Sequence, residues 1–336
     1  MKFKTLMMTV VAGALMATQA LAWGGAGHRM IGEEGVRALP DYMPAFLRTP
    51  KSIADVGEYS REPDRWRGAG KTSDSDLTPA HFIDLDDDGK TLGGQTLDQL
   101  PATRSDFEAA LRAQGIDPFK SGYLPYSTVI AYQEVAKDMA TWRVLSLMET
   151  RETDKLKKAW YHADRLRREQ LLLRDIGVLS HYVGDSTQPL HTSIHYNGWG
   201  DYPNPDGYSK DPVHAPFEGA FVMHNVTNAD IRAAMPAYTP CTERTDLCFD
   251  AHMKQSQEQV VPLYKLIKAG DLVDGNADMK AFAVHQLGLG AADLRDALLD
   301  AWRDSKTVKV GYPAWTYDDF VGGKVENPWT SLNGSD

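Results

Sequence analysis

The sequence predicts an all-α protein, built as a single, mostly helical domain with long loops. Five segments place apolar residues at three- and four-residue spacing with charged residues between them, which is the pattern of amphipathic helices. These segments cover residues 104–114, 128–149, 153–183, 251–269 and 277–303. Strand-like alternation is scarce and no internal repeat is visible, so neither βαβ units nor a repeat fold is expected.

Stretches rich in glycine and proline punctuate the helical segments and predict the long loops. They lie at residues 68–79, 89–94, 197–216 and 311–336. The last of them also carries five aromatic residues: Tyr312, Trp315, Tyr317, Phe320 and Trp329. We therefore expect a helical domain over residues 23–305 and an irregular C-terminal extension, residues 306–336, that packs on it.

Composition narrows the class of protein. The 336 residues are 42% hydrophobic and 24% charged, which is typical of a globular chain and excludes a largely disordered or multi-span membrane protein. Asp and Glu outnumber Lys and Arg by 46 to 36, giving a net charge of -10. Such a chain is a poor general binder of polyanions, although a bound metal ion could reverse the sign of the potential at one site.

The first 22 residues have the pattern of a secretory signal peptide. Lys2 and Lys4 precede a short apolar run at residues 6–17, and Ala20-Leu21-Ala22 is a small-x-small cleavage site. The apolar run is too short to span a bilayer, which disfavours the alternative of an uncleaved membrane anchor. We expect cleavage before Trp23 and a secreted or periplasmic protein. Removal of two lysines would leave 46 acidic and 34 basic residues, a net charge near -12.

Cys241 and Cys248 are the only cysteines of the chain. In an exported protein, two cysteines so close in sequence predict a disulfide that closes a small loop. A cysteine metal knuckle is not expected, because the spacing is wrong and no second pair exists.

Several of the ten histidines stand at metal-ligand spacing. His181 and Asp185 are four residues apart in a predicted helix, so both side chains share one face, and His214 and Glu218 repeat this spacing. Imidazole and carboxylate at this spacing can bind zinc from one helix face. Three further histidines add to the pattern, namely His28, His81 and His191. Together they predict a polynuclear zinc site.

The expected mature N-terminus adds a possible ligand. Cleavage would leave Trp23 first, and a free α-amino nitrogen with the carbonyl oxygen of the same residue can chelate a metal. Glycines at positions 24, 25 and 27 would let the chain fold tightly, so that His28 reaches the same ion. The alternative is a flexible glycine-rich terminus.

These motifs resemble the zinc-dependent phospholipase C and S1/P1 nuclease superfamily, over residues 23 to about 302. The motifs are Trp-Gly-Gly-Ala-Gly-His (23–28), Pro-Asp-Arg-Trp-Arg (63–67), His-Phe-Ile-Asp (81–84), His-Tyr-Val-Gly-Asp-Ser-Thr-Gln-Pro-Leu-His (181–191) and His-Ala-Pro-Phe-Glu (214–218). The resemblance implies a mostly helical fold with three Zn²⁺ ions that cleaves phosphodiester bonds. The implied ligands are Asp64, His81, His181 and Asp185 for one ion, His191, His214 and Glu218 for a second, and Trp23, His28 and a bridging Asp185 for the third.

Asp64 and Arg67 are the expected catalytic side chains. A carboxylate at Asp64 would orient or deprotonate the attacking water, and Arg67 would stabilise charge on the transition state. The alternative for Arg67 is a surface arginine. The resemblance to the nucleases implies that Phe82 and Asp84 bind substrate, an aromatic ring and a carboxylate that hold a base.

The substrate class is open between two members of the superfamily. Glu218 resembles the phospholipases C, whereas the nucleases generally have Asp at this place, and this favours a phospholipase C that releases diacylglycerol and a phosphorylated head group. An aromatic entrance, with Trp199, Tyr202 and Tyr208 as its candidate residues, would then meet the membrane surface. The alternative is that these aromatic residues only pack within the loop. The alternatives are a single-strand nuclease that leaves 5′-phosphates and a non-catalytic zinc-binding protein. A monomer without a stable protein partner is expected.

Overall fold

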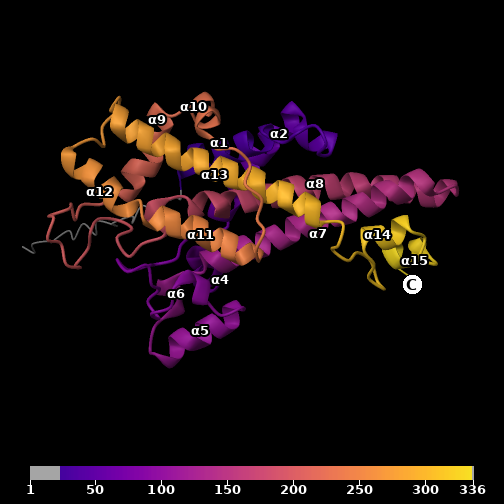
Figure 1. The fold of residues 1–336 in the computed structure, drawn as a ribbon, viewed down its shortest axis with the longest axis horizontal. Helices are drawn as coiled ribbons and strands as arrows, with labels where there is room; N and C mark the ends of the chain where they lie inside the picture. Colours follow the sequence, from indigo (N-terminus) through magenta and orange to yellow (C-terminus); the bar gives the residue numbers. More distant parts are fainter. Residues whose placement is uncertain (1–22, 335–336) are drawn as a thin grey trace, which may run out of the picture.

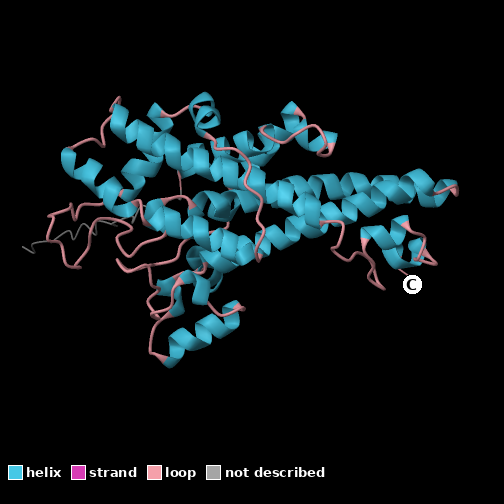
Figure 2. Ribbon diagram, in the orientation of Figure 1, coloured by secondary structure: helices cyan, strands magenta, loops and turns pink. Residues whose placement is uncertain are grey.

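The computed structural model describes residues 23–334 and confirms the all-α fold. Figure 2 shows helices and loops, and within the described residues only isolated β-bridges are found. The predicted signal peptide lies outside the described residues. Among residues 23–334, no helix is both long and apolar enough to cross a membrane.

Fifteen α-helices, several of them a single turn, are found within the described residues, together with shorter helical turns (Figure 1). The α-helices are α1 (Gly24–Arg37), α2 (Pro50–Tyr59), α3 (Glu62–Arg65), α4 (Lys71–Leu77), α5 (Arg104–Ala113), α6 (Pro118–Ser121), α7 (Leu124–Arg151), α8 (Lys155–Ser186), α9 (Val222–Asn225), α10 (Asn228–Ala234), α11 (Thr245–Gln257), α12 (Val260–Ala269), α13 (Ala277–Asp304), α14 (Tyr317–Val321) and α15 (Pro328–Asn333). The turns are η1 (Ala45–Arg48), η2 (Thr78–His81), η3 (Leu97–Gln99), η4 (Pro189–His191) and the π-helical η5 (Pro216–Phe221).

Four of the five predicted helices are found within a few residues of their expected bounds, as α5, α7, α8 and α13. The expected helix over residues 251–269 is instead two helices, α11 and α12, that meet at Glu258 and Gln259. The glycine-rich start of the domain is not a flexible segment, because α1 begins at Gly24. Part of the expected loop 68–79 is also helical, as α4.

The long helices α7 and α8 form an antiparallel hairpin against which α13 and α11 pack (Figure 1). Asp154 begins α8 by accepting hydrogen bonds from the backbone nitrogens of Leu156 and Lys157, a typical N-cap. The C-terminal half of α8, from Leu172 to Ser186, is buried except at Arg174. A helix with apolar residues on all sides belongs in the core, and this half of α8 is where His181 and Asp185 lie.

Gly184 allows α1 and α8 to approach closely. A Cβ atom at this position would lie 3.1 Å from the Nδ1 atom of His28 and 3.1 Å from Ile31, both on α1. The imidazole rings of His28 and His181 consequently stack, with centroids 3.9 Å apart. A larger residue at Gly184 would separate two of the candidate metal ligands.

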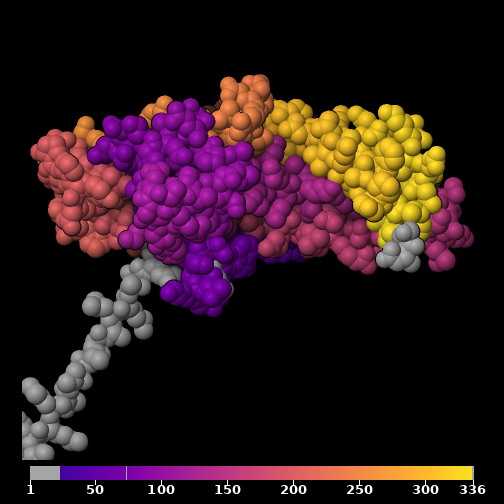
Figure 3. Space-filling model, turned by 90° about the horizontal axis from the view of Figure 1, so that it is seen from below, coloured from indigo at the N-terminus to yellow at the C-terminus, as the bar shows by residue number. Residues whose placement is uncertain are grey.

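The segment that follows α13 packs on the distal part of the α7–α8 hairpin, as the yellow region of Figure 3 shows. Trp329 of α15 contacts Trp160 and Tyr161 of α8, with ring centroids 5.2 and 5.7 Å apart. Arg151, the last residue of α7, donates a hydrogen bond to the carbonyl oxygen of Phe320. This segment therefore buries the outer end of the hairpin rather than the region of the histidines.

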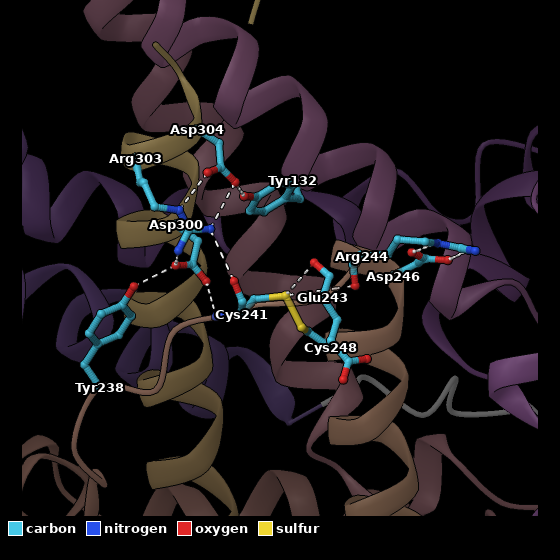
Figure 4. The surroundings of a disulfide bond; sticks show 10 residues. All are labelled: Tyr132, Tyr238, Cys241, Glu243, Arg244, Asp246, Cys248, Asp300, Arg303 and Asp304. Atoms are coloured by element: carbon cyan, nitrogen blue, oxygen red, sulfur yellow. Dashed lines mark hydrogen bonds and ion pairs between the residues drawn. A yellow bond between two sulfur atoms is a disulfide. The ribbon is translucent and has the colours of Figure 1, made fainter. Parts of the chain in front are cut away.

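The predicted disulfide between Cys241 and Cys248 is confirmed (Figure 4). Asp300 of α13 accepts a hydrogen bond from the backbone nitrogen of Cys241 at 2.8 Å, and Cys248 lies in the first turns of α11. The bridge thus ties the loop before α11 to that helix, while Asp300 holds the same loop against α13.

Candidate metal centre

Eight of the nine expected ligands are side chains, which come from separate parts of the chain and meet in the interior. α1 supplies His28, α3 supplies Asp64, η2 supplies His81 and η4 supplies His191, while α8 supplies His181 and Asp185. The last two, His214 and Glu218, lie just before and within η5. All eight are buried except Asp64, which is partly buried.

Asp185 lies at the centre of four histidines. Its Oδ2 atom is 3.1 Å from the Nδ1 atom of His81 and 3.3 Å from the Nε2 atom of His181. Its Oδ1 atom is 3.5 Å from the Nε2 atom of His28 and 3.8 Å from the Nδ1 atom of His191. One fully buried carboxylate therefore faces ring nitrogens from four different elements, an arrangement that suits a carboxylate shared between cations.

Two backbone carbonyl groups orient the imidazoles. The Nδ1 atom of His181 donates to the carbonyl oxygen of Ser60 at 2.7 Å, and the Nδ1 atom of His191 donates to that of His81 at 2.5 Å. A histidine that donates from one nitrogen presents the lone pair of the other, which is how metal-binding histidines are commonly oriented. In both residues the Nε2 atom is then the acceptor. That of His191 has no hydrogen-bond partner, and that of His181 lies 2.8 Å from the Nδ1 atom of His81.

The second cluster consists of His191, His214 and Glu218. The Oε2 atom of Glu218 is 2.7 Å from the Nε2 atom of His214 and 3.8 Å from that of His191. Gln188 donates to the same carboxylate oxygen at 3.3 Å. The side-chain oxygen of Asn197 accepts from the backbone nitrogen of His214 at 3.2 Å and so fixes the start of this segment.

Burial shifts the pKa values of several candidate ligands away from their usual values. Desolvation raises the pKa of Glu218 to about 7 and lowers the pKa of His214 to about 4. For Asp185, desolvation is outweighed by His181 and His191, and its pKa is held well below the usual range. Burial also lowers the pKa of His28 well below the usual value of a histidine. Neutral His28 and His214 and ionised Asp185 are in the protonation states in which these side chains bind metals. Burial opposes a charge on His181 as well, but the Asp185 carboxylate outweighs it and raises the pKa of His181.

The donor atoms fit metal ions. Buried atoms without a hydrogen-bond partner gather here: both ring nitrogens of His28, the Nδ1 atom of His214, the Nε2 atoms of His81 and His191, Oδ1 of Asp185 and Oε1 of Glu218. Unpartnered buried polar atoms are rare and costly in proteins. Three groups each bring their ligand atoms within 4.8 Å of one another, namely His28–His181–Asp185, Asp64–His81–His181 and His191–His214–Glu218. These clusters could bind metal ions.

The grouping differs from the expected ligand sets in the residue that is shared. His181 belongs to two groups, with His28 and Asp185 and with Asp64 and His81, whereas Asp185, the expected bridge, belongs to the first of these groups alone. Trp23 is buried beside both clusters: its indole nitrogen donates to the carbonyl oxygen of Gly184 at 2.8 Å, and its ring contacts Phe217. Trp23 is therefore held between Gly184, which precedes Asp185, and Phe217, which precedes Glu218. Its role as a metal ligand through its backbone atoms stays a prediction.

A cavity of about 550 Å³ opens onto the clusters through His81, His191 and His214. Arg67 lines this cavity, and its Nη1 atom lies 3.3 Å from the Oδ1 atom of Asp64. Phe82 and Asp84 line it as well. The structure thus brings the expected catalytic and substrate-binding side chains to the same space as the candidate metal ligands.

The expected aromatic entrance is wrong for two of its three residues. Trp199 and Tyr208 are 4% and 5% exposed, and Trp199 stacks on His195 with centroids 3.7 Å apart. They form part of the packing of the loop rather than its surface. Tyr202 alone of the three lines the cavity, where Tyr196 joins it.

Two positioning side chains, Gln188 and Asn197, were not identified from the sequence. Gln188 is fully buried next to Pro189, and Asn197 begins the glycine- and proline-rich loop. For Gln188, the signal in the sequence was its position between His181 and His191, inside a motif rich in candidate ligands. Nothing in the sequence connects Asn197 with His214.

Comparisons with protein-family models and with curated proteins found no match for the chain. The resemblance to the phospholipase C and S1/P1 nuclease superfamily therefore rests on the motifs and stays a prediction.

Proposed function

We propose that the protein is a metal-dependent phosphodiester hydrolase. The observation that carries the proposal is the set of three His/Asp/Glu groups with unpartnered, buried ligand atoms beside a cavity lined by Arg67. Imidazole with carboxylate ligands favours Zn²⁺ among the common metals, and three such ions are proposed. Export after removal of residues 1–22 is part of the same proposal.

When bound, such ions withdraw negative charge from a phosphodiester and lower the pKa of water. The side chains of the chain itself have complementary roles. Arg67 presents its guanidinium to the cavity and pairs with Asp64, so it is placed to hold a non-bridging phosphate oxygen. Asp64 is the carboxylate placed to accept the proton of an attacking water. Burial of the histidines keeps bulk water from competing for their donor atoms.

A phospholipid is the proposed substrate, with diacylglycerol and a phosphorylated head group as products. The support is the outer part of the cavity, where four apolar or aromatic side chains are between 36% and 52% exposed: Leu92, Phe119, Tyr196 and Tyr202. Exposed apolar side chains around the opening of a polar site are suited to contact with lipid.

A single-stranded nucleic acid is the second candidate, and one observation favours it. Phe82 and Asp84 line the cavity together, where a ring could stack on a base and a carboxyl group could contact the edge of the base. The products would carry 5′-phosphates. The chain's acidic net charge weighs against a long polyanion.

Parallel assays on bis-(p-nitrophenyl) phosphate, phosphatidylcholine vesicles and denatured DNA test the proposal. We expect turnover of the first two substrates, its loss on chelation and recovery with Zn²⁺. Asp64→Asn should abolish turnover, whereas Glu326→Gln, which removes an exposed carboxylate of the C-terminal segment, should not. Tightly bound zinc without turnover of any phosphodiester would instead support a non-catalytic zinc-binding protein.

A further inference from the structure

The outer wall of the cavity carries a lysine that the proposed chemistry does not use. Phe119 and Lys120 of α6 line the cavity together with Asp84 and Tyr202. The cavity's volume of about 550 Å³ lies in the range of small-molecule sites, on the order of 300–1,000 Å³. There is consequently room for a substituent of the substrate beside the scissile phosphate.

Backbone contacts hold α6 against the strand-like segment after His81. The backbone nitrogen of Asp84 donates to the carbonyl oxygen of Ser121 at 2.9 Å, and that of Leu124 donates to the carbonyl oxygen of Phe82 at 3.0 Å. Gly122 permits this approach, because its φ is +82° and a Cβ atom would lie 2.0 Å from the oxygen of Phe82. Lys120 therefore projects from a fixed backbone next to Asp84.

No carboxylate of the cavity wall balances the positive charge of Lys120. Arg67, the other basic residue of the lining, has Asp64 beside it. Burial raises the pKa of Asp84 to about 8, so its carboxyl group is mostly neutral at pH 7. Within residues 23–334, Lys120 has no carboxylate partner. An exposed ammonium group at the side of a ligand cavity can pair with an anion that enters it.

We infer that Lys120 is a specificity-determining residue that binds a second anionic group on the substrate's head group, such as the carboxylate of a serine head group. The inference rests on the proposed function, because it takes the scissile phosphate to lie at the histidines. It predicts a preference for phospholipids whose head group carries an additional negative charge. Phe119, 39% exposed beside Lys120, supplies an apolar face for the carbon atoms of the head group.

Binding of O-phosphoserine and phosphoethanolamine to the zinc-loaded protein tests the inference by calorimetry. The two ligands differ by one carboxylate, and a phosphodiesterase does not cleave either. We expect about fivefold tighter binding of O-phosphoserine, from one ion pair at an exposed side chain, and a weaker preference at high salt. Lys120→Gln should reduce the ratio of affinities to about one. Lys120→Arg should keep it, as should Lys155→Gln, which removes an exposed lysine at the start of α8.

An equal affinity of the wild-type protein for both ligands would overturn the inference, as would an unchanged preference in Lys120→Gln. A second pair, thymidine 5′-phosphate and thymidine 3′,5′-bisphosphate, covers nucleic acid. If Lys120→Gln affects only the discrimination of that pair, the anion is a neighbouring nucleotide phosphate and the head-group assignment is wrong. Failure of the proposed function is distinguishable, because the wild-type protein would then hydrolyse no phosphodiester while its binding preference still depended on Lys120.

Discussion

Removal of the metal ions should lower the stability of the fold by a measurable amount. The groups His191–His214–Glu218 and His28–His181–Asp185 share no residue, so at least two ions are expected. An ion that binds only the folded chain stabilises it by about 4 kcal/mol when its concentration is a thousand times its dissociation constant. Two ions would contribute about 8 kcal/mol. In a domain of this size, with about 2 °C per kcal/mol, the melting temperature should fall by roughly 16 °C.

Calorimetric melting of the zinc-loaded, chelator-treated and zinc-restored protein measures this effect, with the zinc content of each sample determined separately. The restored sample is the control for irreversible damage during chelation. We expect the melting temperature to fall as zinc is lost and to return with it. A fully metal-free protein that melts within about 2 °C of the loaded form would refute the reasoning, since the buried, unpartnered ligand atoms would then not depend on ions.

Three further predictions concern individual residues. Asp185→Asn should lower zinc content more than Glu218→Gln does, and should lower turnover at least about tenfold more, because Asp185 faces four histidines and Glu218 two. Equal losses in the two variants would contradict a bridging role for Asp185. A chain beginning Met-Trp23 should fold but bind about one zinc ion fewer than a chain beginning at Trp23, as metal analysis would detect; equal zinc contents would show that Trp23 is not a ligand. Burial raises the pKa of Asp250 to about 7, so this group destabilises the fold increasingly as pH rises from about 4 to 7. Asp250→Asn should therefore increase the free energy of unfolding by roughly 2 kcal/mol more at pH 8 than at pH 5, and a pH-independent effect in urea denaturation would show that the buried carboxyl does not titrate in this range.

The sequence was informative where structure follows from local periodicity. The apolar spacing of residues 128–149 and 153–183 predicted α7 and α8, and the spacing of His181 and Asp185 correctly placed both on one helix. α1 was not predicted because Gly24, Gly25 and Gly27 have low helix propensity. Tertiary contacts override that preference: a side chain at Gly27 would lie 2.9 Å from the Cβ atom of Trp23, so these glycines serve close packing within the fold.

Contacts between distant elements could not be predicted in this way. Spacing identified the pairs His181–Asp185 and His214–Glu218, but the carbonyl oxygen of Ser60 that orients His181 lies 121 residues away in the chain. The sharing of His181 between two groups likewise depends on how α1, α3 and η2 are placed around α8. Trp199 was misplaced for the same reason, because its stacking on His195 is formed within a loop without periodicity.

The position of Gly184 connects helix packing with the chemistry of the site. Because this residue has no side chain, α1 can place the ring of His28 against that of His181, while its neighbour Asp185 faces both. Without a cation, several ring and carboxylate atoms at this contact are buried and unpartnered, which opposes the close packing of α1 on α8. Metal binding and the docking of α1 should therefore be coupled, so that loss of the ions loosens first the contact between α1 and α8 and not the α7–α8 hairpin, which is held by apolar side chains.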